Sequence, residues 1–232
     1  MLGVIPARGG SKSIPNKNIA NLGNKPLIAY TIAAAHGAAK LDDVIVSTDC
    51  NNIAAVAREY GAYVPFIRPS ELSTDTADSL GVVLHALEFM EHKNNMTYDA
   101  VVMLQPTTPF RDASLIDESL RRLSQSELDS IVSVVDVGAN HPYRMYTLDQ
   151  NQELISFCSG FYDPMMPRQK LPPIYIRSGD IYATRRRCLL EQKSLIGRRS
   201  GALVIEAEYS INIDEPIDLE MARLKFKQLK GA

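Results

Sequence analysis

The sequence predicts an α/β fold of three layers, in which a mainly parallel sheet lies between helices on both of its faces. Two observations indicate this fold. Short apolar runs alternate along the chain with longer segments of helical periodicity, and the apolar runs contain no regular alternation with polar residues. The length of 232 residues, 45% of them hydrophobic, suits one large domain, so we expect residues 1–232 to form a single domain.

The first part of the chain supplies two strands and two helices. Residues 2–6 (LGVIP) form an apolar run of the length expected for a buried strand, and residues 43–47 (DVIVS) repeat this pattern. Residues 25–40 (KPLIAYTIAAAHGAAK) combine helical periodicity with a high alanine content. Residues 51–60 (NNIAAVAREY) have the pattern of a short amphipathic helix, which Gly61 is placed to end.

The middle of the chain continues the same alternation. We expect a third extended segment at residues 63–67 and a strand at residues 100–104 (AVVML), which has no polar position. Residues 130–137 (SIVSVVDV) predict a further strand. Residues 78–92 (DSLGVVLHALEFMEH) and 114–124 show helical periodicity. This order of strands and helices is typical of a parallel sheet.

Residues 140–172 break the alternation, and we expect them to protrude as a dimerisation arm or lid. The segment is rich in proline and carries aromatic side chains, among them Phe161 and Tyr162, that no other segment obviously covers. Residues 174–183 (IYIRSGDIYA) are predicted to form a strand, a turn and a second strand. Residues 203–213 are predicted to be extended, and residues 218–230 to form a closing amphipathic helix.

Charge and composition argue against several classes of protein. The 25 Lys and Arg nearly balance the 27 Asp and Glu, so we expect no nucleic-acid partner. No apolar run approaches the roughly 20 residues of a membrane helix, and the first residues lack the basic segment of a signal peptide, so no membrane association is expected. The cysteines at 50, 158 and 188 show no pairing pattern, which favours a reducing cytoplasm.

The loop after the first expected strand carries the strongest functional signal, because ligands of open α/β sheets bind at the carboxyl ends of strands. Gly9 and Gly10 allow backbone amides to approach an anion, and Arg8, Lys12 and Lys17 supply three cations within ten positions. This combination suits a polyphosphate. The spacing is that of neither a P-loop nor a dinucleotide-binding loop. A solvated glycine turn with incidental charges is the alternative.

Several segments, in the order found here, resemble the acylneuraminate cytidylyltransferases, which are the CMP-sialic acid synthetases. The first is the loop itself, ARGGSKSIPNKN at residues 7–18. The others span nearly the whole chain: Val46-Ser47-Thr48-Asp49, Arg68-Pro69 with Asp75-Thr76-Ala77-Asp78-Ser79, Leu104-Gln105-Pro106-Thr107-Thr108-Pro109-Phe110-Arg111, Pro167-Arg168-Gln169, Ser178-Gly179-Asp180-Ile181-Tyr182 and Ile213-Asp214. The resemblance implies a nucleotide-diphospho-sugar transferase-like fold and a single nucleotidyltransferase domain. It also implies transfer of CMP from CTP to the anomeric hydroxyl of a sialic-acid-like 2-keto sugar acid, with release of pyrophosphate.

The resemblance assigns roles in the nucleotide site. Arg8 and Lys17 are the expected catalytic residues, with Lys17 at the α-phosphate. The expected nucleotide-binding residues are Arg8, Gly9, Gly10, Ser11, Lys12, Lys17, Asn18, Arg68 and Ser79. Two of these assignments have plainer alternatives, a surface ion pair for Arg68 and a helix cap for Ser79.

The sugar acid is assigned to Gln105, Arg144, Arg168, Tyr175 and Arg177. Gln105 follows an apolar strand at the expected active edge, and turn formation is its alternative role. A guanidinium group binds a carboxylate through two parallel hydrogen bonds, so arginines on the arm suit a sugar acid. In the family the arm crosses to the partner subunit. The resemblance therefore implies a homodimer in which Arg144 and Arg168 enter the neighbour's site, with solvated arm charge as the alternative.

The chain departs from the family pattern at two places. The usual Asp-x-Asp pair that holds Mg²⁺ is Asn212-Ile213-Asp214 here. Positions two apart share one face of a strand, so we expect Asn212 and Asp214 to hold Mg²⁺ together, although an amide oxygen brings no charge. The usual Asn-Gly-Ala is Ser178-Gly179-Asp180 here. If Asp180 faces the site, it places a negative charge near the anionic sugar that Arg177 would compensate; the alternative is that Asp180 faces the other side of the strand. These departures suggest a sugar other than N-acetylneuraminate.

Two other functions remain open on the sequence alone. A transferase of the same fold using another nucleotide, such as GTP, is one, because base choice depends on contacts near residues 68–79. The second alternative is a nucleotide-binding protein that has lost catalysis, and Asn212 is the residue that would indicate this loss. The intact set of Arg8, Lys12 and Lys17 speaks against that loss.

Overall fold

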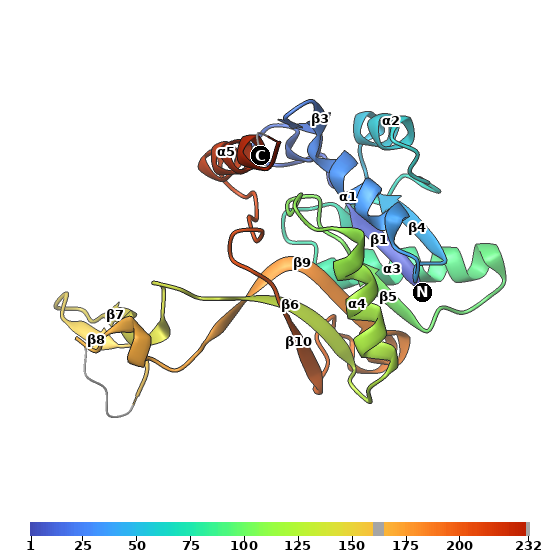
Figure 1. Cartoon of the computed structure of the whole chain (residues 1–232). Helices are drawn as coiled ribbons and strands as arrows, with labels where there is room; N and C mark the ends of the chain where they lie inside the picture. The colour runs from blue at the N-terminus through green and yellow to red at the C-terminus, as the bar shows by residue number, and fades with distance from the viewer. Residues whose placement is uncertain (160–164, 231–232) are drawn as a thin grey trace.

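The centre of the protein is a six-stranded sheet with the order β10-β6-β9-β5-β1-β4 (Figure 1). The structure is a computed structural model, and it describes residues 1–159 and 165–230. The strands of the sheet are β1 (Leu2–Pro6), β4 (Asp43–Ser47), β5 (Ala100–Met103), β6 (Ser130–Asp136), β9 (Tyr175–Arg185) and β10 (Ser200–Val204). β1 pairs in parallel with β4 and β5, β10 pairs in parallel with β6, and β9 runs antiparallel to β5 and β6. The predicted mainly parallel sheet is confirmed.

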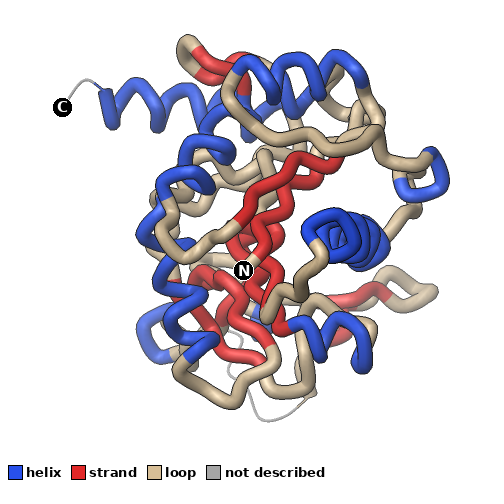
Figure 2. The backbone as a smooth tube through the Cα atoms, turned by 90° about the vertical axis from the view of Figure 1, so that its right-hand side faces the viewer, coloured by secondary structure: helices blue, strands red, loops and turns tan. Residues whose placement is uncertain are grey.

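Helices cover both faces of the sheet, as predicted (Figure 2). The α-helices are α1 (Leu27–Gly37), α2 (Asn51–Glu59), α3 (Ser79–Asn94), α4 (Ala113–Ser124) and α5 (Pro216–Lys230). α1, α2 and α4 pack with Ile5 of β1 on one face. α3 and the π-helical turn η5 (Cys188–Gln192) pack with Val4 of β1 on the other. Consecutive side chains of a strand point to opposite faces, so β1 contributes to both apolar layers.

Short elements complete the fold. Near the first loop lie η1 (Lys17–Ile19) and the small hairpin of β2 (Asn21–Leu22) and β3 (Lys25–Pro26). The others are η2 (Ser70–Leu72), η3 (Pro142–Arg144), β7 (Tyr146–Leu148), β8 (Leu154–Ser156) and η4 (Arg168–Lys170). None of the described helices is both long and apolar enough to cross a membrane.

Two sequence predictions of elements were wrong in form. Residues 174–183 are not a strand, a turn and a strand but belong to one long strand, β9, whose pairing register shifts opposite Val132 and Val134 of β6. Residues 203–213 are extended only as far as Val204. Residues 63–67, which were predicted to be extended, make two isolated parallel bridges, one with β4 and one with the residue after it, without forming a regular strand. This last segment contains a proline, which has no amide hydrogen to donate to a ladder.

The arm leaves the sheet after β6 and returns to it through β9. It carries the β7–β8 hairpin and projects from the body of the protein in Figure 1. His141 connects the two chain segments at the base of the arm. Its Nδ1 accepts a hydrogen bond from the Tyr143 amide, and its Nε2 lies 3.0 Å from the carbonyl oxygen of Pro172. Phe161 and Tyr162 lie outside the described residues.

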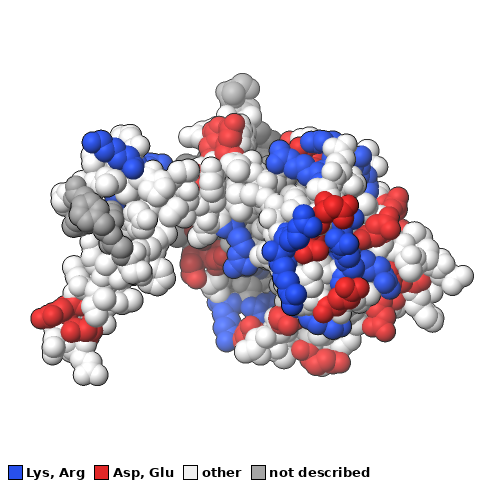
Figure 3. All heavy atoms as spheres, turned by 90° about the horizontal axis from the view of Figure 1, so that it is seen from below, with Lys and Arg blue, Asp and Glu red and all other residues white. Residues whose placement is uncertain are grey.

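The arm's surface is unusually apolar. Leu148, Leu154, Phe157 and Met165 are all exposed, and Figure 3 shows most of the visible arm surface free of charged groups, whereas Lys, Arg, Asp and Glu alternate over the body. An apolar surface of this kind is typical of a site of association with another protein surface. Residues 140–172 therefore carry an exposed apolar surface, and their role as a dimerisation arm stays a prediction.

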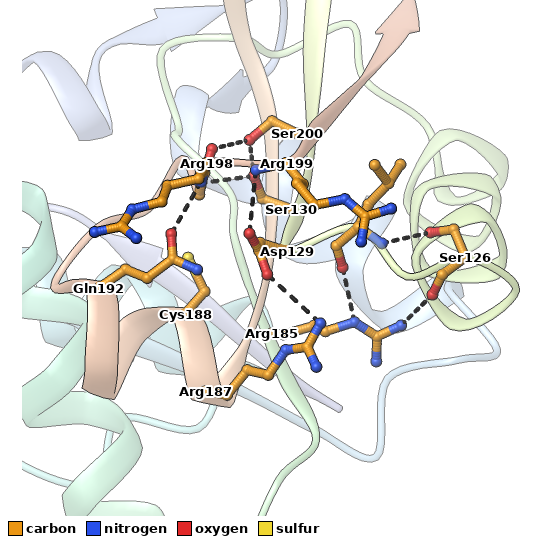
Figure 4. A network of polar contacts seen from close by, with 12 residues as sticks. Ser126, Asp129, Ser130, Arg185, Arg187, Cys188, Gln192, Arg198, Arg199 and Ser200 are labelled. Atoms are coloured by element: carbon orange, nitrogen blue, oxygen red, sulfur yellow. Dashed lines mark hydrogen bonds and ion pairs between the residues drawn. The ribbon is translucent and has the colours of Figure 1, made fainter.

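Several arginines of the C-terminal half hold together the edge of the sheet where the parallel strands begin (Figure 4). Arg185 donates hydrogen bonds to three backbone carbonyls at the end of α4 and in the loop that follows it. Asp129, which precedes β6, accepts a hydrogen bond from the backbone amide of Arg199 at 3.1 Å and lies 3.5 Å from the guanidinium of Arg187. A cation at a helix C-terminus is favourable, so these basic residues stabilise the fold.

A buried arginine joins three parts of the fold beneath the opposite edge of the sheet. Arg111 is 5% exposed. It donates to the hydroxyls of Thr31 and Thr108 and to the carbonyl oxygens of Gln105 and Asp180 at 2.7–3.2 Å. Burial lowers the pKa of Arg111 to about 10, and burial raises the pKa of Asp180. The buried guanidinium of Arg111 thus links α1, the loop after β5 and the middle of β9.

We expect the substitution Arg111→Met to lower the free energy of unfolding by about 3–5 kcal/mol, because it leaves a buried carboxyl and several acceptors without their cation. Denaturant unfolding followed by circular dichroism measures this loss. The matched control is Arg121→Met on the exposed side of α4, where a change within about 0.5 kcal/mol is expected. Equal losses in the two variants would contradict the role given to Arg111.

Candidate active site

A pocket of about 350 Å³ opens where β1, β4 and β5 end, which is the edge at which the sequence placed the site. This volume is within the range of small-molecule sites. Eight of the predicted residues line it: Arg8, Lys17, Asn18, Arg68, Ser79, Gln105, Asn212 and Asp214. The structure therefore brings together residues from distant parts of the chain. Lys17 and Asp214, for example, are 197 positions apart and are joined by a hydrogen bond.

A second hollow of about 370 Å³ adjoins the first. The two share a wall formed by Arg8, Lys17, Asn18 and Asp214, and the second hollow is also lined by Lys12 and by the hydroxyl residues Ser11 and Ser13. One hollow is therefore bounded by residues predicted for the nucleoside, and the other by residues predicted for the phosphates. An elongated anion lying along the shared wall would contact both.

The first loop is held in shape from two sides. The side chain of Asn18 is buried and donates to the carbonyl oxygen of Arg8 at 2.9 Å, so it fixes the loop backbone. The amide of Gly9 donates to Asp49 at 2.9 Å. A Cβ at Gly9 would lie 2.9 Å from the Cβ of Cys50, which is closer than real Cβ contacts, so only glycine fits there. Gly10, by contrast, faces open space.

Each cation of the site is paired with an aspartate from another segment. Lys17 Nζ lies 3.0 Å from Asp214 Oδ1, and Arg68 lies 3.7 Å from Asp49. Arg8 and Lys12 share one partner, Asp75, at 2.9 and 2.5 Å. The hydrogen bond from Lys12 is the main cause that lowers the pKa of the Asp75 carboxyl, while desolvation opposes it and Arg8 adds to it. The four cations and three aspartates therefore nearly balance in charge.

Asp49 and Asp75 were not assigned roles from the sequence. Both lie in segments that carry the family resemblance, Val46-Ser47-Thr48-Asp49 and Asp75-Thr76-Ala77-Asp78-Ser79, and both follow or precede elements that end at the site. The signal that could have found them is the excess of cations in the first loop, because a cluster of like charges needs anions nearby when no ligand is bound.

Arg68 is not a surface residue. It is 4% exposed, its Nε donates to the Ser73 hydroxyl at 3.1 Å, and its backbone amide donates to the carbonyl oxygen of Thr48 at 2.7 Å. Burial is the main cause that lowers the pKa of Arg68. The alternative of a surface ion pair is therefore wrong. The alternative role of Ser79 as a cap is also wrong, because Asp78 caps α3 by accepting a hydrogen bond from the Gly81 amide.

Gln105 approaches the pocket beside a glycine of β9. Gly179 has a φ of 88°, and a Cβ there would lie 3.0 Å from Gln105 Oε1 and 3.9 Å from the Cγ of Asn212. Glycine in the middle of a strand is unfavourable unless a close approach requires it. The positive φ and the missing side chain make room for both amide side chains at the pocket wall.

The carboxyl group of Asp180 does not face this pocket. It is 1% exposed, it lines a different hollow together with Arg111, and Arg111 is the cation whose charge opposes the effect of burial on its pKa. The expectation that Arg177 compensates it was wrong, since Arg177 is exposed in the first half of β9. The bulged backbone at Gly179 turns the side chain of Asp180 toward the loop after β5.

The remaining predicted sugar-site residues lie away from the pocket in this chain. Tyr175 and Arg177 are exposed on the part of β9 nearest the arm. Arg144 donates to the carbonyl oxygen of Met166 at 3.3 Å, and Arg168 lies 3.7 Å from Asp136. Their assignment to a sugar acid depends on a partner subunit and stays a prediction.

Asn212 and Asp214 converge as predicted but for a different reason. They lie in a loop before α5 and not in a strand, and the amide of Asn212 donates to Asp214 Oδ2 at 2.7 Å. Lys17 occupies the other carboxylate oxygen. Among the described residues no group of three or more His, Cys, Asp or Glu is placed to hold a metal ion. One carboxylate and one amide oxygen fit Mg²⁺ when substrate phosphates and water supply the other ligands.

Comparison with known proteins agrees with this geometry. A family model described as cytidylyltransferase matches residues 2–228. The chain belongs to the cytidylyltransferase family. A CMP-N,N'-diacetyllegionaminic acid synthase of Legionella pneumophila is 36% identical over 94% of this chain and 92% of its own. An N-acylneuraminate cytidylyltransferase of Escherichia coli is 34% identical over 96% of this chain and 51% of its own. The resemblance stated from the sequence is thus confirmed.

The family's fold is also found among solved structures. The solved structure of a CMP:2-keto-3-deoxy-manno-octonic acid synthetase complexed with CTP is similar to this one over 98% of each chain. The TM-score is 0.72 and the sequence identity is 21%. At this identity the likeness concerns the fold, and it confirms the predicted nucleotidyltransferase-like architecture of this cytidylyltransferase.

Proposed function

We propose that this cytidylyltransferase transfers CMP from CTP to the anomeric hydroxyl of a sialic-acid-like 2-keto sugar acid and releases pyrophosphate. The main support for this proposal is the wall shared by the two hollows. Arg8 and Lys17 lie on this wall, between the predicted nucleoside and phosphate regions. The names of the two relatives, a CMP–sugar acid synthase and a cytidylyltransferase, support the same reaction class.

Different residues of the site are suited to different parts of a bound nucleoside triphosphate. In the reaction the anomeric oxygen attacks the α-phosphorus and the bond to pyrophosphate breaks, so catalysis depends on alignment and on neutralising the phosphate oxygens. Lys17 lies on the shared wall and is suited to the α-phosphate. Arg8 and Lys12 are suited to the leaving pyrophosphate, and buried Arg68 lies on the nucleoside side.

Asp214 and Asn212 are the residues that would hold Mg²⁺. The ion supplies charge neutralisation at the phosphate oxygens when bound. Asp214 forms an ion pair with Lys17, so a cation at Asp214 would leave the lysine ammonium available to the α-phosphate. The chain's own contribution is therefore to hold one carboxylate and one ammonium on the same wall.

The sugar acid would lie beside Gln105, with the arm of a second subunit closing the site. Its carboxylate suits the guanidinium groups of Arg144 or Arg168, and neither group reaches the pocket of its own chain in this structure. The exposed apolar side chains of the arm support a homodimer in which they are buried.

The reaction is tested by measuring pyrophosphate release with CTP and a panel of nonulosonic acids, with GTP as the competing nucleotide. We expect turnover with CTP, and we expect Lys17→Ala to cut it at least about a hundredfold, as for loss of one charge-stabilising donor. Lys40→Ala, at an exposed position away from the pocket, is the matched control and should keep wild-type turnover. Preference for GTP, or near-wild-type turnover in Lys17→Ala, would contradict the assignment.

The metal site predicts a response to added charge. Asn212→Asp places two carboxylates side by side, so it should lower the Mg²⁺ concentration needed for half-maximal rate, because carboxylate count raises affinity for a hard cation. Asp214→Ala should nearly abolish activity. Rates are measured against Mg²⁺ for wild type and both variants. An unchanged Mg²⁺ requirement in Asn212→Asp would exclude position 212 as a ligand.

A shared site predicts complementation between two inactive variants. Lys17→Ala and Arg168→Ala protomers are mixed under conditions of subunit exchange. If sites are shared, one site of each hybrid collects both lesions and the other is intact, so activity should return to roughly a quarter of the wild-type value, since half of the dimers are hybrids. Absence of recovery despite demonstrated exchange would show that each site is built from one chain.

A further inference from the structure

We propose that Asp75 is an internal competitor of pyrophosphate: it pairs with Arg8 and Lys12, is displaced from them by a diphosphate group and pairs with them again when the product leaves. The inference rests on the proposed function, because it takes Arg8 and Lys12 as the cations that hold the leaving group. It adds a residue that sets how tightly the site retains the product.

The contacts of Asp75 use both of its oxygens. Oδ1 accepts from Arg8 Nη1 at 2.9 Å, and Oδ2 lies 2.5 Å from Lys12 Nζ. The neighbouring carbonyl oxygen of Thr74 accepts from the same Arg8 nitrogen at 3.2 Å. Carboxylate and phosphate oxygens are both anionic acceptors, so Asp75 pairs with the same two cations that a diphosphate would bind.

The position of these contacts places Asp75 in the path of a triphosphate. Asp75 lines the first hollow, Lys12 lines the second, and Arg8 lines both. The ion pairs therefore cross between the predicted nucleoside and phosphate regions. A ligand that reaches only the nucleoside side leaves these pairs intact, whereas a ligand with a pyrophosphate group must displace the carboxylate.

Asp75 differs in this respect from the other aspartates of the site. Asp49 also accepts a hydrogen bond from the Gly9 amide and so fixes the first loop. Asp214 is positioned by Asn212 as well as by Lys17. The hydrogen bonds and ion pairs found for the Asp75 side chain in the described chain go to the two cations alone.

The local structure allows the Asp75 carboxylate to separate from its two cations and to pair with them again. Asp75 belongs to the segment between η2 and α3, its side chain is 45% exposed, and that of Lys12 is 81% exposed. Exposed ion pairs are individually weak, so a diphosphate with several negative charges can replace the carboxylate. The same carboxylate remains tethered beside the cations, so it rebinds them when pyrophosphate dissociates.

The test is to measure binding of inorganic pyrophosphate, CTP and CMP by calorimetry to wild type, Asp75→Asn and Glu118→Gln. Glu118 on α4 is the matched control, because it also pairs with two cations, Arg121 and Arg122, far from the pocket, and its replacement changes the net charge equally. We expect Asp75→Asn to bind pyrophosphate and CTP about three- to tenfold more tightly, with CMP affinity unchanged. Glu118→Gln should match wild type for all three ligands.

Steady-state inhibition provides a second readout. Pyrophosphate should inhibit Asp75→Asn at a correspondingly lower concentration than wild type, and the KM for CTP should fall. If Asp75 only supported the fold, its replacement would raise both the inhibitory concentration of pyrophosphate and the KM for CTP. The direction of the change therefore separates a competitor of pyrophosphate from a structural residue. Unchanged or weaker pyrophosphate binding in Asp75→Asn would overturn the proposal, as would an equal gain for CMP.

The outcomes also distinguish this proposal from the proposed function. A wild-type protein that binds pyrophosphate but transfers no CMP to any sugar acid would contradict the function, and the comparison with Asp75→Asn would still decide the role of Asp75. A wild-type protein and an Asp75→Asn variant that both fail to bind pyrophosphate would overturn both proposals.

Discussion

The site depends on charge balance between a cationic loop and aspartates brought to it by other segments. The cations of the first loop lie close together at the end of β1, and like charges at this separation repel one another. Asp75 and Asp214 neutralise the loop from two sides, and Asp49 fixes its backbone while it faces the buried Arg68. An anionic ligand then exchanges one set of ionic contacts for another, which keeps the cations in place whether or not the site is filled.

The antiparallel strand β9 connects this site with the rest of the fold. Its bulge is held by the Ser133 hydroxyl, which accepts from the amide of Ile181 at 2.8 Å and from the Ser178 hydroxyl at 2.7 Å. The same bulge gives Gly179 its positive φ and places the carbonyl of Asp180 on the buried Arg111. The middle of β9 therefore shapes the pocket wall, and its first residues connect the sheet to the arm.

The sequence predicted the layered architecture and most helices, because these follow from local periodicity. It failed at β9 because Ser178, Gly179 and Asp180 form a polar group that locally favours a turn. In the fold the Ser133 hydroxyl accepts a hydrogen bond from Ser178, Arg111 donates to the backbone carbonyl of Asp180, and the strand is continuous. The burial of Arg68 was hidden for a similar reason. Its partners come from neighbouring strands and loops, and no local pattern marks them.

The sequence by itself determined the fold class, the family and the first loop with its cations, since each is expressed in contiguous residues. The tertiary structure alone decided which anions face those cations, where the charge of Asp180 points, and how Asn212 and Asp214 meet outside a strand. The physical reason is the range of the interactions. Periodicity and motifs act over a few residues, whereas ion pairs and buried hydrogen bonds join segments as distant as Lys17 and Asp214.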